Sequence, residues 1–186
     1  IVGTSSPRRA AQLRRRVPGL EITAFRGNVA TRLKRLEDRE ADATILAAAG
    51  LDRLGVDVGT PVATEDMLPA PGQGAIGVEV RSDNLALRQR LATISDADSY
   101  VAVRAERAFA RTLGGSCHSP VAALAEALGE DRFRLRVEIL TPDGGIARSD
   151  VVDFAKQDAV VAGDRLGRRL LSEAEPELAA IFDGAA

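Results

Sequence analysis

The fold of this chain is constrained most by its first 54 residues, in which short strand-like segments alternate with helix-like segments. Three such pairs follow one another: 1–3 with 6–16, 20–25 with 28–36, and 43–46 with 47–54. Ser6 suits an N-cap with Pro7 in the first helical position, and Asn28 suits the N-cap of the next helix. Strand–helix–strand order predicts an α/β layer built on parallel strands.

The rest of the chain has a different pattern, which begins with a turn-rich stretch at 68–74 that suits a hinge. The elements expected beyond it are a strand over 75–80, a helix over 84–94, a helix from an N-cap at Ser95 to 113, strands over 132–139 and 146–154, and a closing helix over 158–172. The segment 132–139 alternates apolar and charged side chains, as a half-buried strand does. This part therefore predicts an α+β unit with an antiparallel sheet covered by helices.

Composition and charge exclude several classes of protein. No run approaches the roughly 18 apolar residues needed to span a bilayer. The net charge of -2 argues against nonspecific binding to nucleic acid. One cysteine and one histidine exclude an internal disulfide and a zinc finger, so no metal is expected. No signal peptide is visible, so we expect a cytoplasmic protein without a membrane partner.

Two clusters of polar residues lie where a predicted strand gives way to a helix. The first comprises Thr4, Ser5, Ser6, Arg8 and Arg9, and the second comprises Arg26, Asn28 and Arg32. Helix N-termini bind anions, and open α/β sheets bind ligands at the carboxyl ends of their strands. The pattern predicts a site for a ligand with several carboxylates or phosphates. Solvated arginines on two capped helices are the alternative.

The single cysteine, Cys117, lies in a Gly-rich loop beside the single histidine, His118. It is a candidate to carry a group covalently or to act as a nucleophile, and a small buried thiol is the alternative. Neighbours in sequence often point apart, and no Asn or Asp is obviously placed to complete a catalytic triad. Gln73, in the turn-rich stretch, is a candidate to reach the ligand from the hinge.

Five ordered motifs resemble the porphobilinogen deaminase family. They are GTSSPRR at 3–9, FRGNVATRL at 25–33, ILAAAGLDRLG at 45–55, LPAPGQGAIGVEVR at 68–81 and AERAFARTLGGSCHSPVAA at 105–123. The resemblance implies a periplasmic-binding-protein-like (type II) domain followed by a small α+β domain with a three-stranded antiparallel sheet. It places most of the family's second domain at 1–65, a hinge, a strand crossing to the first domain and a linking helix at 66–96, and the third domain at 97–186.

The resemblance also implies a reaction and a cofactor. The family condenses four units of the small-molecule substrate porphobilinogen head to tail into hydroxymethylbilane and releases ammonia. A dipyrromethane cofactor, attached through a thioether, primes the chain, and the matching cysteine here is Cys117. Residues matching cofactor-binding positions are Thr4, Ser5, Ser6, Arg8 and Arg9; those matching substrate-binding positions are Arg26, Asn28, Arg32, Ala47 and Gln73.

The sequence departs from the family pattern before Ile1, where the family has an N-terminal domain with its catalytic aspartate. No aspartate of this chain matches that residue, so we expect an incomplete enzyme. The N-terminal segment, as a separate chain, is a candidate partner. Two other functions remain open. A non-catalytic anion-binding module would explain the arginines but not Cys117. A cysteine-nucleophile transferase or hydrolase would explain Cys117 but not the arginines.

Overall fold

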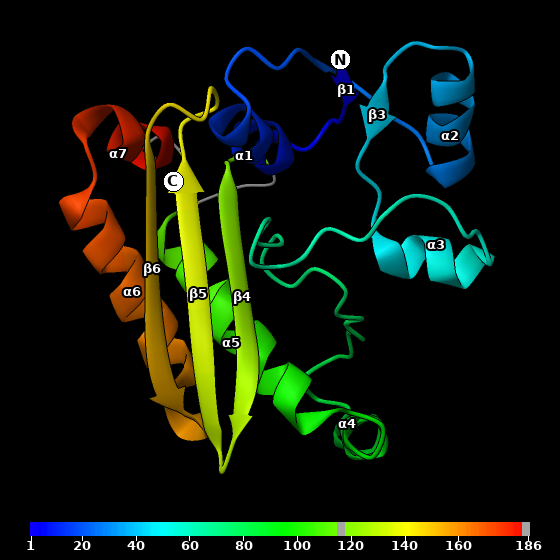
Figure 1. Ribbon diagram of the computed structural model, residues 1–186. Coiled ribbons are helices and arrows are strands. Elements are labelled where there is room, and N and C mark those ends of the chain that lie inside the picture. Colours follow the sequence, from blue (N-terminus) through cyan, green and yellow to red (C-terminus); the bar gives the residue numbers. More distant parts are fainter. Residues whose placement is uncertain (115–117, 184–186) are drawn as a thin grey trace.

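The computed structural model describes residues 1–114 and 118–183 (Figure 1). The first part is a small α/β layer whose strands pair in parallel in the order β2-β1-β3. Its elements are β1 (Val2–Gly3), α1 (Pro7–Arg16), β2 (Ile22–Thr23), α2 (Val29–Glu37), β3 (Ala43–Thr44) and α3 (Ala48–Leu54). The predicted alternation and parallel pairing are confirmed, although each strand is only two residues long.

Both predicted N-caps of this part are confirmed. The Ser6 side chain accepts a hydrogen bond from the Arg9 backbone N–H at 3.4 Å. The Asn28 side chain accepts one from the Thr31 backbone N–H at 2.9 Å. These bonds begin α1 and α2 directly after the loops that follow β1 and β2, so both helix N-termini lie at the carboxyl side of the parallel strands.

Gly3 allows the end of β1 to approach the Phe25 ring. A Cβ atom at position 3 would lie 2.4 Å from Phe25 Cγ, well inside van der Waals contact. The Phe25 side chain is fully buried, and the Arg35 guanidinium lies 4.0 Å from its ring centroid. The ring therefore fixes the position of β1, and with it the start of the loop that leads into α1.

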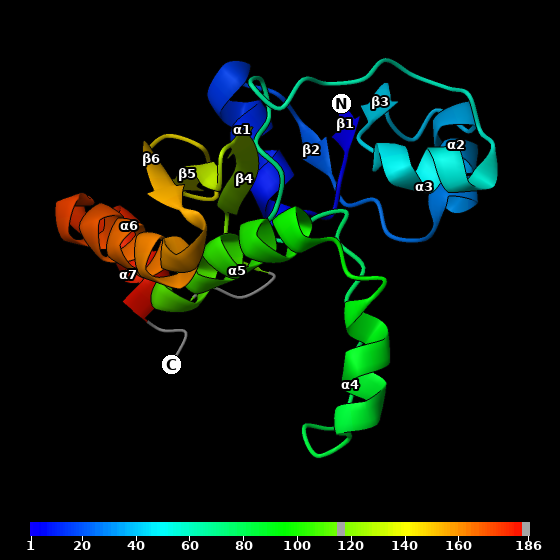
Figure 2. The same ribbon diagram turned by 90° about the horizontal axis from the view of Figure 1, so that it is seen from below.

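The C-terminal part is an antiparallel sheet in the order β4-β5-β6, with helices on one face (Figures 1 and 2). Its elements are α5 (Ala97–Thr112), β4 (Val121–Gly129), β5 (Arg132–Leu140), β6 (Ala147–Ala155), a 3-10 turn (Lys156–Asp158), α6 (Ala159–Glu173) and α7 (Pro176–Asp183). The predicted antiparallel sheet and its helical cover are confirmed. The N-cap of α5 is Asp96 rather than Ser95, and its side chain accepts from the Ser99 N–H at 2.7 Å.

The main core lies between this sheet and its helices. On β5 every second side chain from Phe133 to Ile139 is almost fully buried, and the polar side chains between them face the other side of the sheet. Phe133 also stacks on Phe154 of β6, with ring centroids 5.6 Å apart. The apolar side chains in the alternating pattern that predicted a half-buried strand thus face the core, and the charged ones face the other side of the sheet.

Two glycines of α6 allow it to pack closely against α5. A Cβ atom at Gly163 would lie 2.3 Å from the Ala105 carbonyl oxygen and 2.9 Å from the Phe109 backbone nitrogen. One turn later, a Cβ atom at Gly167 would lie 3.0 Å from the Thr112 side chain. The backbones therefore meet without intervening side chains, and the fixed oxygen of Ala105 cannot move aside as a flexible side chain could.

We expect Gly163→Ala to destabilise the protein although alanine favours helices. Overpacking of this kind costs about 1–3 kcal/mol, which lowers the melting temperature of a chain of this size by roughly 2–12 °C. Thermal unfolding followed by circular dichroism measures the change. Gly77→Ala is the matched control, because a Cβ atom there would have no neighbour within 4 Å. Equal melting temperatures for Gly163→Ala and the parent chain would contradict this account of the helix packing.

Helix α1 lies on the opposite face of the C-terminal sheet from α5 and α6 (Figure 2). Gln12 of α1 donates a hydrogen bond to the Glu138 carboxylate on β5 at 2.8 Å. The turn between β5 and β6 also fits against α1, because a Cβ atom at Gly144 would lie 2.4 Å from the Ala11 carbonyl oxygen. Gly144 has a φ of 76°, which glycine adopts without strain. These contacts hold the two parts of the chain together through α1.

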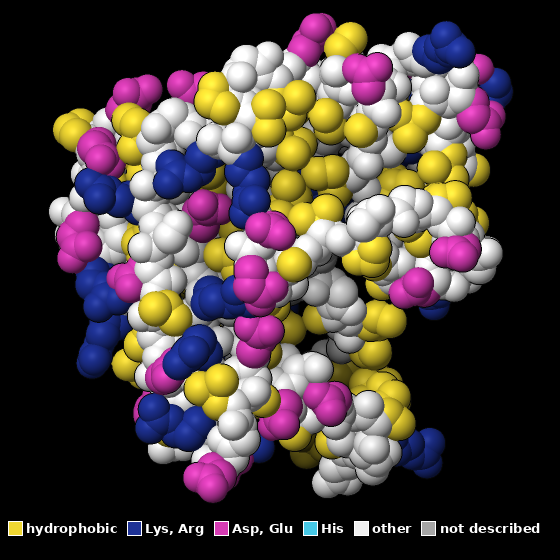
Figure 3. All heavy atoms as spheres, viewed as in Figure 1, with side chains coloured by type: hydrophobic (Ala, Val, Ile, Leu, Met, Phe, Trp, Pro, Cys, Tyr) yellow, Lys and Arg dark blue, Asp and Glu magenta, His cyan; other side chains and the backbone are white. Residues whose placement is uncertain are grey.

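The predicted strand over 75–80 does not form within the described residues, which give this segment no strand partner. The Ile76 and Val78 side chains are 84% and 63% exposed. The predicted helix that follows it is confirmed as α4 (Leu85–Ala92), which projects away from both parts (Figure 2). At the lower right of Figure 3, hydrophobic side chains lie on the surface around this projecting segment.

Among the described residues, no helix has the length and apolar character to cross a membrane.

Candidate functional site

The hydroxyl groups between β1 and α1 shape a tight turn. The buried Thr4 side chain accepts a hydrogen bond from the Ser6 backbone N–H at 3.2 Å. The Ser5 hydroxyl donates to the Phe25 carbonyl oxygen at 2.6 Å. With Ser6 as the N-cap, all three predicted hydroxyls orient the backbone at the N-terminus of α1. They place the first turn of this helix, with its arginines, at the carboxyl end of β1.

The Arg8 guanidinium is buried in a polar cluster behind this turn. Its Nη1 donates to the Leu68 carbonyl oxygen and, at 2.7 Å, to the Gln12 side chain. Its Nη2 donates to Gln73 Oε1 at 3.3 Å. The structure thus brings together two residues predicted from distant motifs, Arg8 and Gln73. Arg8 Nε is also buried, and it has no hydrogen-bond partner.

The surroundings of Arg8 and Arg9 disfavour their positive charges. Burial and, to a lesser extent, the neighbouring Arg9 lower the pKa of Arg8 to about 10, and Glu138 opposes part of this shift. Burial also lowers the pKa of Arg9, and the positive charge of Arg32 contributes to the lowering. Arg8 remains cationic at pH 7, because its pKa of about 10 lies three units higher. The site therefore holds positive charge at a cost that a bound anion would offset.

The second predicted cluster lies beside the first. Asn28 caps α2 and accepts from both the Thr31 backbone N–H and its hydroxyl, at 2.9 and 3.0 Å. Arg32 Nε donates to the Gly27 carbonyl oxygen at 3.1 Å, and Gly27 has a φ of 110°. The influence of Arg32 on the pKa of Arg9 shows that the two guanidinium groups lie near each other. Arg26, in the loop before α2, is exposed.

The end of β3 completes the arrangement. Arg9 Nη1 donates to the Ile45 carbonyl oxygen at 2.8 Å, two residues before Ala47. Ala47 is exposed and is the N-cap residue of α3, where its side chain makes no capping bond. The carboxyl ends of the three parallel strands thus meet at one edge, as the sequence pattern predicts.

The predicted arginines have no carboxylate partner within the described part of the chain. Each of the ion pairs found there joins other groups, and most of these pairs lie at the surface. Arg8, Arg9 and Arg32 are all at least half-buried. Planar guanidinium groups bind carboxylates in pairs of charge-assisted hydrogen bonds. The arrangement can therefore hold a ligand with several carboxylate groups.

Cys117, the predicted attachment residue, lies outside the described residues. His118 is exposed. Within residues 1–114 and 118–183, no three His, Cys, Asp or Glu side chains form a group that could hold a metal ion.

Three participants in the polar cluster were not predicted from the sequence. They are Gln12, Glu138 and Glu106. Gln12 lies four residues after Arg8, so helical spacing alone could have placed it on the same face of α1. Glu138 and Glu106 come from the C-terminal part, and no local spacing connects them to α1.

Two family models match this chain. The family model for the porphobilinogen deaminase dipyrromethane cofactor-binding domain matches residues 1–89, and the model for the porphobilinogen deaminase C-terminal domain matches residues 100–172. The first match contains both arginine clusters and Gln73. The second contains most of α5, Cys117 and the antiparallel sheet.

Curated proteins named porphobilinogen deaminase are similar along nearly all of the chain. The protein from Sphingopyxis alaskensis is 52% identical over 184 residues, which are 97% of this chain and 57% of that protein. The protein from Paracoccus denitrificans is 50% identical over 175 residues, 93% of this chain and 54% of that protein. The chain thus spans little more than half the length of these relatives. Since matched family models cover both of its parts and these identities extend through it, the chain belongs to the porphobilinogen deaminase family.

Proposed function

We propose that this chain provides the cofactor-binding and chain-binding part of a porphobilinogen deaminase. The complete activity is the stepwise condensation of four porphobilinogen units into hydroxymethylbilane with release of four ammonia molecules. The observation that carries the proposal is the group of Arg8, Arg9 and Arg32, which lack carboxylate partners among the described residues and meet at the carboxyl ends of parallel strands. Pyrroles with acetate and propionate side chains supply the missing carboxylates.

The residues of the first cluster fit the dipyrromethane. Arg8 Nε is a buried donor without a partner, and Arg9 has donors beyond the one that binds Ile45. These groups would bind cofactor carboxylates, and Thr4, Ser5 and Ser6 hold the turn that presents them. When attached at Cys117, the dipyrromethane supplies a free pyrrole α-carbon to which the first substrate unit is joined.

The second cluster would bind the substrate and the growing chain. Arg26 is exposed, and Arg32 is near enough to Arg9 for its charge to lower the pKa of Arg9, so carboxylates of successive pyrroles could bind from one arginine to the next. Asn28, Ala47 and Gln73 would line the same edge. Guanidinium groups stay charged and cannot transfer protons at neutral pH, so these residues bind and orient. We assign proton transfer to an aspartate of the N-terminal domain found in the family.

We propose the domain organisation on the same basis. Residues 1–65 would form most of a domain of the periplasmic-binding-protein type, 66–96 a hinge with a segment crossing to the N-terminal domain, and 97–186 the cofactor-bearing domain. The exposed apolar side chains of 75–94 support this assignment. They would be covered by the N-terminal domain, which we propose as the macromolecular partner of this chain.

The two arginine clusters should be separable by substitution. We expect Arg9→Leu to lower occupancy by the covalent dipyrromethane and Arg26→Leu to leave it loaded but slow elongation. Each change removes a charge-assisted hydrogen bond worth about 1.5–3 kcal/mol, or roughly 10- to 150-fold in binding. Intact mass measures cofactor loading, and chain-length analysis of bound pyrroles measures elongation.

Arg53→Leu is the matched control, because Arg53 is an exposed arginine of α3 at a distance in sequence from both clusters. It should change neither loading nor elongation. Full loading and normal turnover of Arg9→Leu would refute the assignment of the first cluster. Reversible binding of polycarboxylates with no covalent adduct in the parent chain would favour the anion-binding module instead.

A further inference from the structure

Glu106 is a buried carboxylate that the proposed function leaves without a role. It lies on α5, only 5% exposed, and both of its oxygens accept hydrogen bonds from backbone N–H groups. Oε2 accepts from Gly72 at 2.6 Å, and Oε1 accepts from Ala125 at 2.8 Å. Burial raises the pKa of this carboxyl, and the two backbone hydrogen bonds oppose that rise. A carboxylate held in this way joins three separate segments of the chain.

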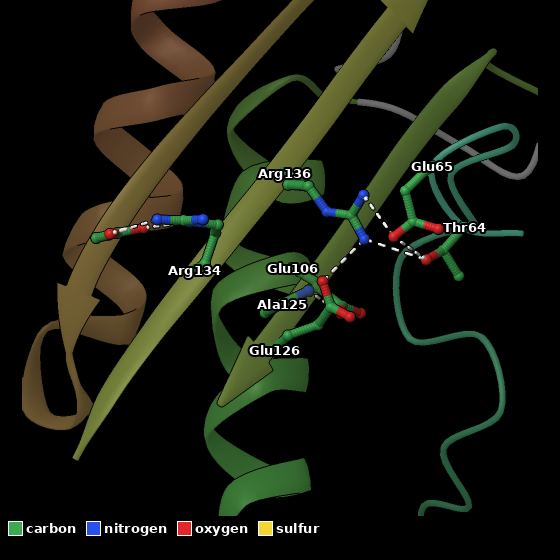
Figure 4. A network of polar contacts seen from close by, with 8 residues as sticks. Thr64, Glu65, Glu106, Ala125, Glu126, Arg134 and Arg136 are labelled. Atoms are coloured by element: carbon green, nitrogen blue, oxygen red, sulfur yellow. Dashed lines mark hydrogen bonds and ion pairs between the residues drawn. The ribbon is translucent and has the colours of Figure 1, made fainter. Parts of the chain in front are cut away.

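The first segment is the outer edge of β4, where N–H groups point away from β5. The Ala123 N–H at this edge donates directly to the Pro69 carbonyl oxygen at 3.0 Å. The next outward N–H, that of Ala125, donates to Glu106 instead. Gly72 of the loop 69–74 donates to the same carboxylate. The direct backbone contact between this loop and β4 ends at Pro69, and beyond it the Glu106 side chain connects the two. Figure 4 shows Glu106 beside Ala125 on β4, with the Arg136 ion-pair network nearby.

The second segment is the loop 69–74, which touches Arg8 through a different residue. Gln73 Oε1 accepts from Arg8 Nη2 at 3.3 Å, and the Leu68 carbonyl oxygen accepts from Arg8 Nη1. One short loop therefore binds Arg8 on one side and Glu106 on the other. The third segment is α5 itself, which ends at Thr112, five residues before Cys117.

We propose that Glu106 is a positioning residue that fixes the loop 69–74, and with it Arg8 and Gln73, relative to α5. The proposal rests on the proposed function, because it gives a reason to hold Arg8 at a set place relative to the helix that leads to Cys117. Glu106 itself need not touch a ligand. It sets the geometry between a carboxylate-binding guanidinium and α5, which come from separate parts of the chain.

Glu106→Gln tests this with little change of shape. A glutamine can accept one of the two N–H groups, but its own amide N–H₂ then faces the other. We expect amide hydrogen exchange in residues 66–74 to become about 10-fold faster or more, because one buried charge-assisted bond is lost. Exchange in β6 and α6 should stay at the parent rate. A role in general stability would instead speed exchange throughout the C-terminal part.

Glu126→Gln is the matched control. Glu126 is the next residue on β4 and forms an exposed ion pair with Arg136, so its side chain points to the other face of the sheet. It should leave exchange in residues 66–74 unchanged. The second measurement is the rate of adduct formation at Cys117 with porphobilinogen and the complementary N-terminal domain, divided by the rate of alkylation of Cys117 by iodoacetamide. We expect Glu106→Gln to lower this ratio about 10-fold and Glu126→Gln to leave it unchanged.

Selective loss of protection together with the lower ratio supports the proposal. Unchanged exchange in 66–74, or an unchanged ratio, overturns it. Global loss of protection in Glu106→Gln also overturns it, since the residue would then stabilise the whole C-terminal part. If the parent chain forms no adduct even with the complementary N-terminal domain present, the proposed function fails, and the exchange measurement alone decides whether Glu106 positions the loop.

Discussion

Replacing Cys117 with serine is expected to abolish the covalent cofactor and, with it, all turnover of the assembled enzyme. Cys117 is the only cysteine, so no other thiol can replace it. A serine hydroxyl stays protonated near neutral pH and is a far weaker nucleophile than a thiolate. Intact mass should show the unmodified variant, and uroporphyrin formation from porphobilinogen should fall to background.

His118→Ala is the control for this result. The carrier assignment gives His118 no role, so the variant should keep the adduct and most of its activity. In the cysteine-nucleophile alternative, His118 activates Cys117. That alternative therefore predicts a large loss of activity in both Cys117→Ser and His118→Ala. A Cys117→Ser protein that carries the adduct and turns over normally would show that attachment occurs elsewhere.

Residues 1–186 on their own are expected to show no sustained turnover of porphobilinogen. The arginines can bind and orient carboxylates, but the proton-transfer group that the family resemblance implies has no match in this sequence. General acid–base catalysis typically contributes 10²–10⁴ in rate, and loss of one wall of a cleft also removes the positioning of the reacting carbons. Adding the N-terminal domain of the Sphingopyxis alaskensis relative as a separate chain should restore uroporphyrin formation.

The exposed segment 75–94 provides the matched pair of variants for this experiment. Ile76 is 84% exposed in a segment without a partner, whereas Val161 is 58% exposed on α6. Ile76→Asp should block restoration because it puts a charge into the proposed contact, and Val161→Asp should not. Neither change should lower the stability of the isolated chain. Steady multiple turnover by residues 1–186 alone would show that the essential catalytic groups lie within them.

Secondary structure was predicted correctly where local residue patterns determine it. Prediction failed where strand formation depends on pairing with a segment distant in sequence. Residues 121–129, Val-Ala-Ala-Leu-Ala-Glu-Ala-Leu-Gly, consist largely of helix-forming residues, yet they form β4 because β5 pairs with them along their whole length. In contrast, 75–80 has the composition of a strand, but residues 1–114 and 118–183 place no strand beside it. Propensity favours a strand, and pairing determines whether it forms.

The sequence predicted only part of the candidate site, because some of its contacts join residues that are distant in sequence. The two clusters at strand ends follow from local order, since parallel strands bring their carboxyl ends to one edge. What local order could not predict is that the two Nη atoms of Arg8 also bind Leu68 and Gln73. These contacts join the loop 68–74 to α1 and, through tertiary packing, leave Arg8 Nε as a buried donor without a partner among the described residues.

The central claim is that the arginine clusters serve a dipyrromethane attached at Cys117. Its most direct test is the intact mass of residues 1–186 after incubation with porphobilinogen and the complementary N-terminal domain, followed by peptide mapping. The account predicts a mass gain of two pyrrole units that survives denaturation and maps to the peptide containing Cys117. An unmodified chain under conditions where the assembled enzyme turns over, or an adduct on any other peptide, would contradict it.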